Sequence, residues 1–280
     1  MSLAPSAPGR VGRDGALHLA FERRGAATVL AACRSTLPLQ VLAPVALDDP
    51  AAVVSMLNPT GGVLGGDRLS IDVEVACGAH ACLTTPSATR VYRTAGAPAV
   101  QHVRLIVGAD AVMEWVPDHT IPSAGASLRQ TFEAEVGPGA TLIAVDAFAA
   151  GRVARGEAWR FARLDSTLTV RDALGLVLHD RFVLCGDERW SSIGLAEGRA
   201  YFATVVLVAD GGLDEVAAHL PAALGTIDGM TAAVARLPRR GLMVRCLATG
   251  APALTDGLEA IWTLARRRLL DLPPLALRKP

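Results

Sequence analysis

The 280-residue chain carries 27 Lys and Arg residues against 27 Asp and Glu residues, so its formal net charge is zero. A chain without net charge produces no long-range electrostatic attraction for nucleic acid or anionic lipid. We therefore expect neither nucleic acid nor a membrane as a partner. Five dispersed cysteines without a CxxC motif indicate reduced thiols in a cytoplasmic protein. No run reaches the roughly 18 apolar residues of a membrane span, and no signal-peptide core is visible near the N-terminus.

The first 200 residues predict a tail and a β-rich body. Residues 1–13 are rich in proline and glycine and are expected to form a flexible tail. From residue 14 to about residue 200, short alternating apolar and polar runs between turn residues predict strands, beginning with 16–21, 28–36 and 53–57. Aromatic residues make up only 4% of the chain, so the core must consist mainly of Ala, Val and Leu.

A weak internal repeat crosses this body. Gly-Ala pairs begin at Gly78, Gly108 and Gly139, about 30 residues apart, and each lies between two strand-like runs. A fixed period of this kind favours stacked β units, as in a β-helix, in which each unit covers the apolar face of its neighbour. Ordinary hairpins at similar intervals are the alternative.

The pattern changes after residue 200 and predicts a small α+β portion over residues 201–270. Apolar residues with helical spacing predict one helix over 213–224 and a clearer one over 252–270, with Pro252 in its first turn. The basic triplet that starts at Arg266 complements the negative end of the second helix dipole. Residues 271–280 are proline-rich and are expected to form a C-terminal tail.

Residues 58–69, with the sequence NPTGGVLGGDRL, concentrate the most unusual chemistry. The segment has the outline of a phosphate-binding loop, but an acid stands where that loop requires lysine, which argues against nucleotide binding. Two interpretations remain: a close backbone crossing between packed strands, or a functional carboxylate at Asp67. The glycines that supply the backbone freedom are Gly61, Gly62, Gly65 and Gly66.

Two further segments suggest sites. Cys77, His80 and Cys82 bring three ligands suited to nickel, zinc or copper into six residues, although buried thiols beside an exposed histidine are the favoured interpretation. His119, next to an aspartate and between two prolines, is a second candidate ligand. The hydroxyl groups of the segment LTTPSATRVYR either line a polar cavity or satisfy the backbone of turns.

Several motifs together resemble one known family. NPTGGVLGGDRL followed by a strand and LTTPSATRVYR, and then EWVPDHTI, GRVARGE and GLMVRCL, are similar to the urease accessory protein UreD (UreH) family over roughly residues 15–270. The resemblance implies a β-rich, non-enzymatic scaffold that binds urease apoprotein, UreF and the GTPase UreG for nickel insertion. It implies no tightly bound cofactor, with nickel only in transit.

The resemblance also implies a nickel route lined by Asp67, Thr84, Thr85, Ser87 and Asp146. We expect Asp67→Ala to leave folding intact and to reduce nickel loading of urease. The chain departs from the family in Asp118-His119, where a Gln-Glu pair is common, and in its last residues, where the family tends to end in Pro-Arg-Ile-Trp. The first departure puts in doubt any role of the family's glutamate in this chain. The second would change the details of UreF docking if the C-terminus takes part in it.

Two other classes of protein are kept as alternatives. A β-solenoid hydrolase or lyase acting on carbohydrate would use a pair of acids such as Asp67 and Asp146, held at a fixed separation of about 5–10 Å in an open cleft. An independent metal-binding protein would use Cys77, His80 and Cys82.

Overall fold

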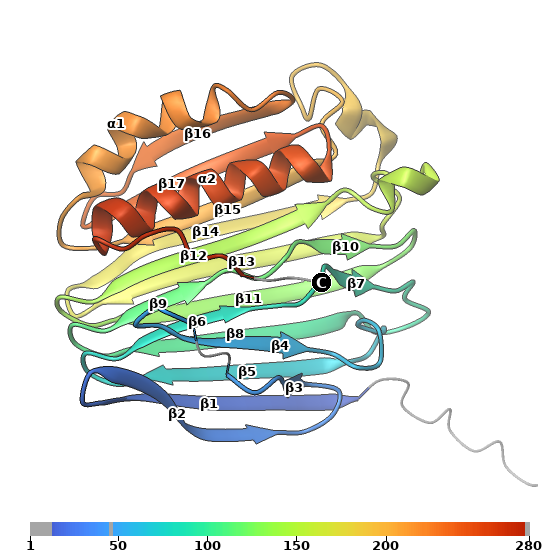
Figure 1. Cartoon of the computed structure of the whole chain (residues 1–280). Helices are drawn as coiled ribbons and strands as arrows, with labels where there is room; N and C mark the ends of the chain where they lie inside the picture. The colour runs from blue at the N-terminus through green and yellow to red at the C-terminus, as the bar shows by residue number, and fades with distance from the viewer. Residues whose placement is uncertain (1–12, 45–46, 278–280) are drawn as a thin grey trace, which may run out of the picture.

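The fold is a two-sheet β structure with two helices on one side, seen in a computed structural model that describes residues 13–44 and 47–277 (Figure 1). One sheet has seven strands, which are, in spatial order, β14 (Gly175–Cys185), β13 (Arg163–Asp172), β11 (Ser127–Val136), β8 (Ala99–Val107), β5 (Arg68–Val75), β1 (Asp14–Arg24) and β2 (Ala27–Ser35).

The other sheet has ten strands. Its main path runs through β16 (Met230–Arg236), β17 (Gly241–Ala248), β15 (Tyr201–Val208), β12 (Thr141–Ala149), β9 (Val112–Trp115), β6 (His80–Thr84), β4 (Ala52–Leu57) and β3 (Gln40–Val41). The short strands β7 (Thr89–Val91) and β10 (Thr120–Pro122) pair with each other beside β12.

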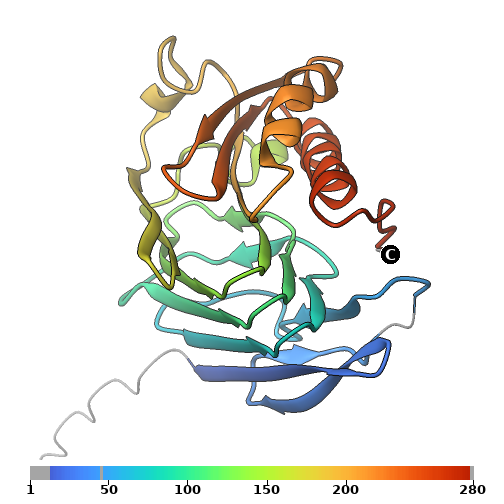
Figure 2. The ribbon, with the colours of Figure 1, turned by 90° about the vertical axis from the view of Figure 1, so that its left-hand side faces the viewer.

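The middle of the chain winds as a solenoid, which confirms the stacked prediction. After each Gly-Ala turn the chain passes from the seven-stranded to the ten-stranded sheet instead of folding back as a hairpin. The strands β5, β8, β11 and β13 are therefore parallel neighbours in one sheet, and β6, β9 and β12 in the other. Each turn of chain stacks on the one before it (Figure 2).

The core between the sheets follows from strand alternation. In β11, every second side chain from Leu128 to Val136 is buried, while Arg129, Glu133 and Glu135 point to the outer face and are exposed. Alanines fill much of the interior, as the composition predicts, and Trp159, Phe148 and Phe202 form one stacked group of rings. Close packing of small side chains thus replaces a ring-rich core.

The two helices pack on the outer face of the ten-stranded sheet and create a second core (Figure 2). They are α1 (Leu213–Leu224) and α2 (Ala251–Leu269), close to the predicted bounds, and Pro252 lies in the first turn of α2 as expected. Ile143 and Leu207 of the sheet pack with Leu220 and Ile261 of the helices in this core. Neither described helix has the length and apolar character needed to cross a bilayer.

The predicted division at residue 200 falls inside a continuous sheet, because β15 pairs along its length with β12. The expected N-terminal tail lies outside the described residues except for Arg13, whose backbone N–H donates to Asp67. Residues 271–277 contain no helix or strand, and the last three residues of the expected C-terminal tail are not among those described.

Candidate functional site

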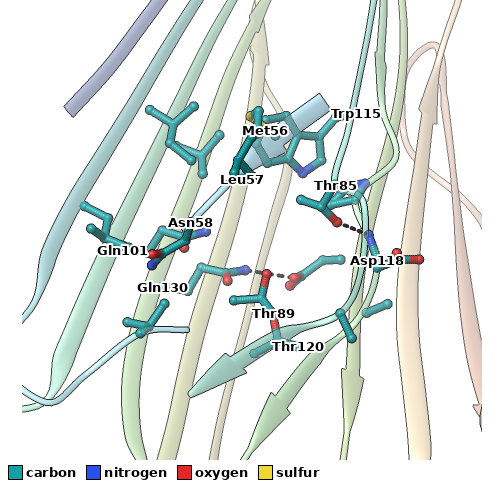
Figure 3. A pocket seen from close by; sticks show the side chains of 18 of the residues that line it. Met56, Leu57, Asn58, Thr85, Thr89, Gln101, Trp115, Asp118, Thr120 and Gln130 are labelled. Carbon is teal, nitrogen blue, oxygen red and sulfur yellow. Dashed lines mark hydrogen bonds between the residues drawn. The ribbon is translucent and has the colours of Figure 1, made fainter. Parts of the chain in front are cut away.

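A cavity of about 330 Å³ lies between the two sheets, beside the glycine loop. Strands β5, β8 and β11 form one wall, and β4, β9 and β12 form the other. Asn58, Gln101 and Gln130 reach it from one side, and Thr85 and Asp118 from the other (Figure 3). Of the route residues that the resemblance implies, three line this cavity: Thr85, Ser87 and Asp146.

Asp146 is a partly buried carboxylate that lines this cavity. It lies in the middle of β12 and accepts hydrogen bonds from Gln130 Nε2 (2.8 Å) and Ser166 Oγ (3.0 Å), while part of its side chain faces the cavity. Burial raises the pKa of Asp146 from 3.8 to about 6, against the effect of the two hydrogen bonds and with a smaller contribution from the negative charge of Asp180. The carboxyl group of Asp146 therefore titrates near pH 6, close to neutral pH.

The Asp146→Asn variant is expected to be more stable than the unmodified chain at neutral pH. Because the folded pKa (about 6) exceeds the unfolded value (3.8), the folded state holds the proton more tightly, and the unmodified chain loses stability as the pH rises through this window. The advantage of the variant should reach about 3 kcal/mol well above pH 6 and vanish below about pH 4.

Thermal unfolding measured from pH 4 to pH 8 tests this prediction. The matched control is Asp256→Asn, which neutralises an exposed aspartate on α2. An advantage of Asp146→Asn that does not change with pH would contradict the assignment of the shifted pKa to this carboxyl group.

Thr84 and His119 do not line the cavity. Thr84 is buried and its Oγ1 donates to the carbonyl oxygen of Val116 (2.9 Å), which links β6 to the segment after β9. The ring of His119 packs edge-on against Tyr201 with 5.7 Å between centroids. Thr85 Oγ1 accepts the backbone N–H of Asp118 (2.9 Å), so this hydroxyl both lines the cavity and positions the Asp118 segment.

The glycine loop forms the mouth of the cavity through Gly61 and Gly62. Gly62 has φ of +153°, and a Cβ there would lie 2.6 Å from the carbonyl oxygen of Arg90, which only glycine avoids. A Cβ on Gly65 would lie 2.9 Å from a methyl carbon of Thr94. Gly62 and Gly65 therefore allow a close approach of neighbouring chain, while Gly61 and Gly66 adopt positive φ in the turns of the loop.

Asp67 is buried at 2% exposure and does not line the cavity. Its Oδ1 accepts the backbone N–H of Arg13 and its Oδ2 accepts that of Leu64, both at 2.8 Å. The carboxylate thus ties the glycine loop to the start of β1. These contacts give Asp67 a structural role, and they argue against the expectation that Asp67→Ala leaves folding intact.

The structure separates the three ligands of the Cys-His-Cys segment. Cys77 is exposed, Cys82 is buried, and His80 is buried with its Nε2 2.6 Å from Glu114 Oε1. The alternative of buried thiols beside an exposed histidine was therefore wrong for Cys77 and His80, because the turn places Cys77 outside and the strand directs His80 inward. Across residues 13–44 and 47–277, no three His, Cys, Asp or Glu side chains are grouped to hold a metal ion.

Glu114 is the centre of a buried network that the sequence analysis missed. It is fully buried in β9 and contacts His80, Trp262 Nε1 and Arg266 Nη1, while Arg266 Nη2 also pairs with Asp49. Burial opposes ionisation of Glu114, but its hydrogen bonds and the positive charges beside it outweigh burial and lower the pKa of this carboxyl group. The network fixes α2 to the sheet.

The predicted role of Arg266 requires correction. The sequence analysis assigned it with its neighbours to the helix dipole, yet Arg266 is fully buried while Arg267 and Arg268 are exposed. The sequence does contain an indication that Arg266 is buried: Arg266 follows Trp262 by four residues and therefore lies on the same inward face of the helix. Gln130 gave a similar signal as a polar residue at an inward position of an alternating strand.

The model of the UreD urease accessory protein family matches residues 13–280. A UreD urease accessory protein of Alkalilimnicola ehrlichii is 36% identical, with 97% of this chain and 92% of the relative covered. Those of Delftia acidovorans (91% and 90% covered) and Deinococcus radiodurans (98% and 98%) are each 34% identical. The chain therefore belongs to the UreD urease accessory protein family.

Proposed function

We propose that this chain is a non-catalytic factor for urease maturation in the cytoplasm, which bridges urease apoprotein and the UreF–UreG complex for nickel insertion. The observation that carries the proposal is the match of the family model over residues 13–280, which supports a role in urease maturation. GTP hydrolysis belongs to UreG in this proposal, in keeping with the acid at position 67 of a loop that would need lysine to bind phosphate.

The cavity suggests how the chain handles nickel. Its polar lining consists of hydroxyl and amide groups, the guanidinium group of Arg90 and the two carboxylates of Asp118 and Asp146, with no cysteine or histidine among the lining residues. Nickel is bound more strongly by imidazole and thiolate than by hydroxyl or amide oxygen, so this lining suits brief contact better than storage. Nickel is therefore cargo in this proposal, and the chain needs no tightly bound cofactor.

The carbohydrate-active alternative depended on Asp67 and Asp146 acting together. Both oxygens of Asp67 accept backbone N–H groups, and Asp67 does not line the cavity that contains Asp146. The geometry therefore does not support that pair as general acid and base. The independent metal-binding alternative receives no support from the separated positions of Cys77, His80 and Cys82.

Co-expression of the tagged chain with urease subunits, UreF and UreG tests the proposal. We expect the chain to recover all three partners and urease to gain nickel only when the chain is present. The Asp146→Asn variant should recover the same partners but lower the nickel content of urease severalfold, because the cavity loses one of its two lining carboxylates.

The Asp256→Asn variant is the control, because it removes one exposed aspartate remote from the cavity lining. Nickel content is measured by atomic absorption on purified urease. Failure to recover urease or UreF–UreG would refute the bridging role, and normal nickel content with Asp146→Asn would refute the cavity route alone.

A further inference from the structure

The cavity between the two sheets has an apolar wall beside its carboxylate, and a route for a metal ion makes no use of such a wall. Trp115 on β9 and Phe132 on β11 both line the cavity, and their rings meet edge to face with 5.8 Å between centroids. Sites for organic ligands combine apolar walls with a few polar groups and have volumes of roughly 300–1,000 Å³. At about 330 Å³, the cavity is large enough for a small organic molecule.

The strand register places these rings beside Asp146. Trp115 pairs with Ala144, and Asp146 lies two residues farther along the same face of β12, about 7–8 Å from the position of Trp115. On β11, Phe132 follows Gln130 by two residues and shares its inward face. Trp115 and Gln130 enter the cavity from its two walls (Figure 3). A ligand one ring in length can therefore contact the aromatic wall and Asp146 together.

The hydrogen bonds determine which polar groups a ligand needs at this position. An ionised carboxylate only accepts, so Gln130 directs Nε2 towards Asp146, to which it donates at 2.8 Å, and keeps Oε1 as an acceptor. One oxygen of Asp146 accepts this bond and the other accepts Ser166 Oγ (3.0 Å), which leaves each oxygen a further lone pair. A ligand bound here must therefore donate N–H or O–H groups.

The charges of the lining favour a cation over an anion or a neutral molecule. The charged side chains that line the cavity are one arginine, Arg90, and two aspartates, Asp118 and Asp146. A planar amidinium or guanidinium group suits this lining, because its fork of N–H donors matches a carboxylate in geometry. Such a cation also binds favourably against aromatic rings, which the wall of Trp115 and Phe132 supplies.

We propose that the cavity binds a small planar organic cation of the amidinium or guanidinium class. The N–H groups of the cation pair with the carboxylate of Asp146 and with Gln130 Oε1, and its apolar part lies against Trp115 and Phe132. The ligand enters at the mouth formed by the glycine loop. This binding does not depend on the proposed role in urease maturation.

Isothermal titration calorimetry with benzamidine tests this proposal, because the benzamidinium ion joins a planar cation to one apolar ring. Benzamide is the matched neutral ligand, since it has the same ring and a similar shape without the charge. The titrations are made at pH 8, where Asp146 is ionised. They are repeated with Asp146→Asn, whose folding is verified by thermal unfolding, and with Asp256→Asn, which neutralises an exposed aspartate on α2.

We expect the unmodified chain to bind benzamidinium at least tenfold more tightly than benzamide, as a charge-assisted hydrogen bond provides. Asp146→Asn should weaken benzamidinium binding about tenfold and leave benzamide binding nearly unchanged, whereas Asp256→Asn should bind both like the unmodified chain. The inference is overturned if benzamidinium does not bind, if benzamide binds equally well, or if Asp146→Asn keeps full affinity. In each of these cases the proposed function stands, because recovery of its partners and nickel loading of urease are measured separately.

Discussion

Replacing Arg266 with Ala is expected to destabilise the protein by about 3–5 kcal/mol, the range seen when one partner of a buried ion pair is removed. Arg266 is fully buried and is the guanidinium shared by Glu114 and Asp49. Without it, the two buried carboxylates lose the guanidinium group that they share, and Glu114 keeps only His80 and Trp262 Nε1 as partners. We expect a fall in melting temperature of roughly 10 °C in a thermal scan.

The neighbouring substitution Arg267→Ala is the control, because it removes the same side chain from an exposed position of α2. It should change the melting temperature little. The double variant Arg266→Met/Glu114→Leu should recover part of the loss by replacing charged groups with apolar ones. Equal effects of Arg266→Ala and Arg267→Ala would contradict the assigned role of the network in fixing α2.

Replacing Asp67 with Ala is expected to cost about 2–4 kcal/mol, because two backbone N–H groups lose their acceptors at a buried position. The affected groups belong to Arg13 and Leu64, so the loss should loosen both the glycine loop and the start of β1. Hydrogen exchange should show faster exchange of these two amides, and a denaturant titration should show the lower stability.

Glu74→Ala is the control for Asp67→Ala, since it removes an exposed carboxylate from β5, the strand that begins directly after Asp67. The stability of the Asp67→Asn variant should lie between those of Asp67→Ala and Glu74→Ala, because one side-chain oxygen still accepts a backbone N–H. Unchanged stability of Asp67→Ala would contradict the structural role and would restore the original expectation of intact folding.

These predictions separate two explanations for a loss of urease maturation. A defect of Asp67→Ala is expected to follow the loss of folded protein, because its carboxylate is committed to the backbone. A defect of Asp146→Asn is expected in protein that is at least as stable as the unmodified chain, because that carboxyl group is ionised at a cost in the folded state. Comparing folded fraction with nickel content distinguishes the two.

Local patterns determined much of the fold. Alternation with a period of two predicted the strands, and the helical spacing of leucines predicted α1 and α2 close to their observed bounds. The Gly-Ala repeat predicted stacking, because a turn at a fixed interval returns the chain to the same position in each coil. The motifs of the glycine loop and of the following hydroxyl-rich segment were sufficient to indicate the family that the comparison establishes.

The sequence by itself therefore determined the β-rich class, the two helices and the family. Only the tertiary structure decided which polar side chains meet. Glu114 and Arg266 are 152 residues apart in the chain, and Asp146 finds Gln130 on the facing sheet. No local period encodes such pairs, since they depend on which strands become neighbours. For the same reason Asp67, whose position in the sequence suggested chemistry, is held by backbone N–H groups that no motif identifies.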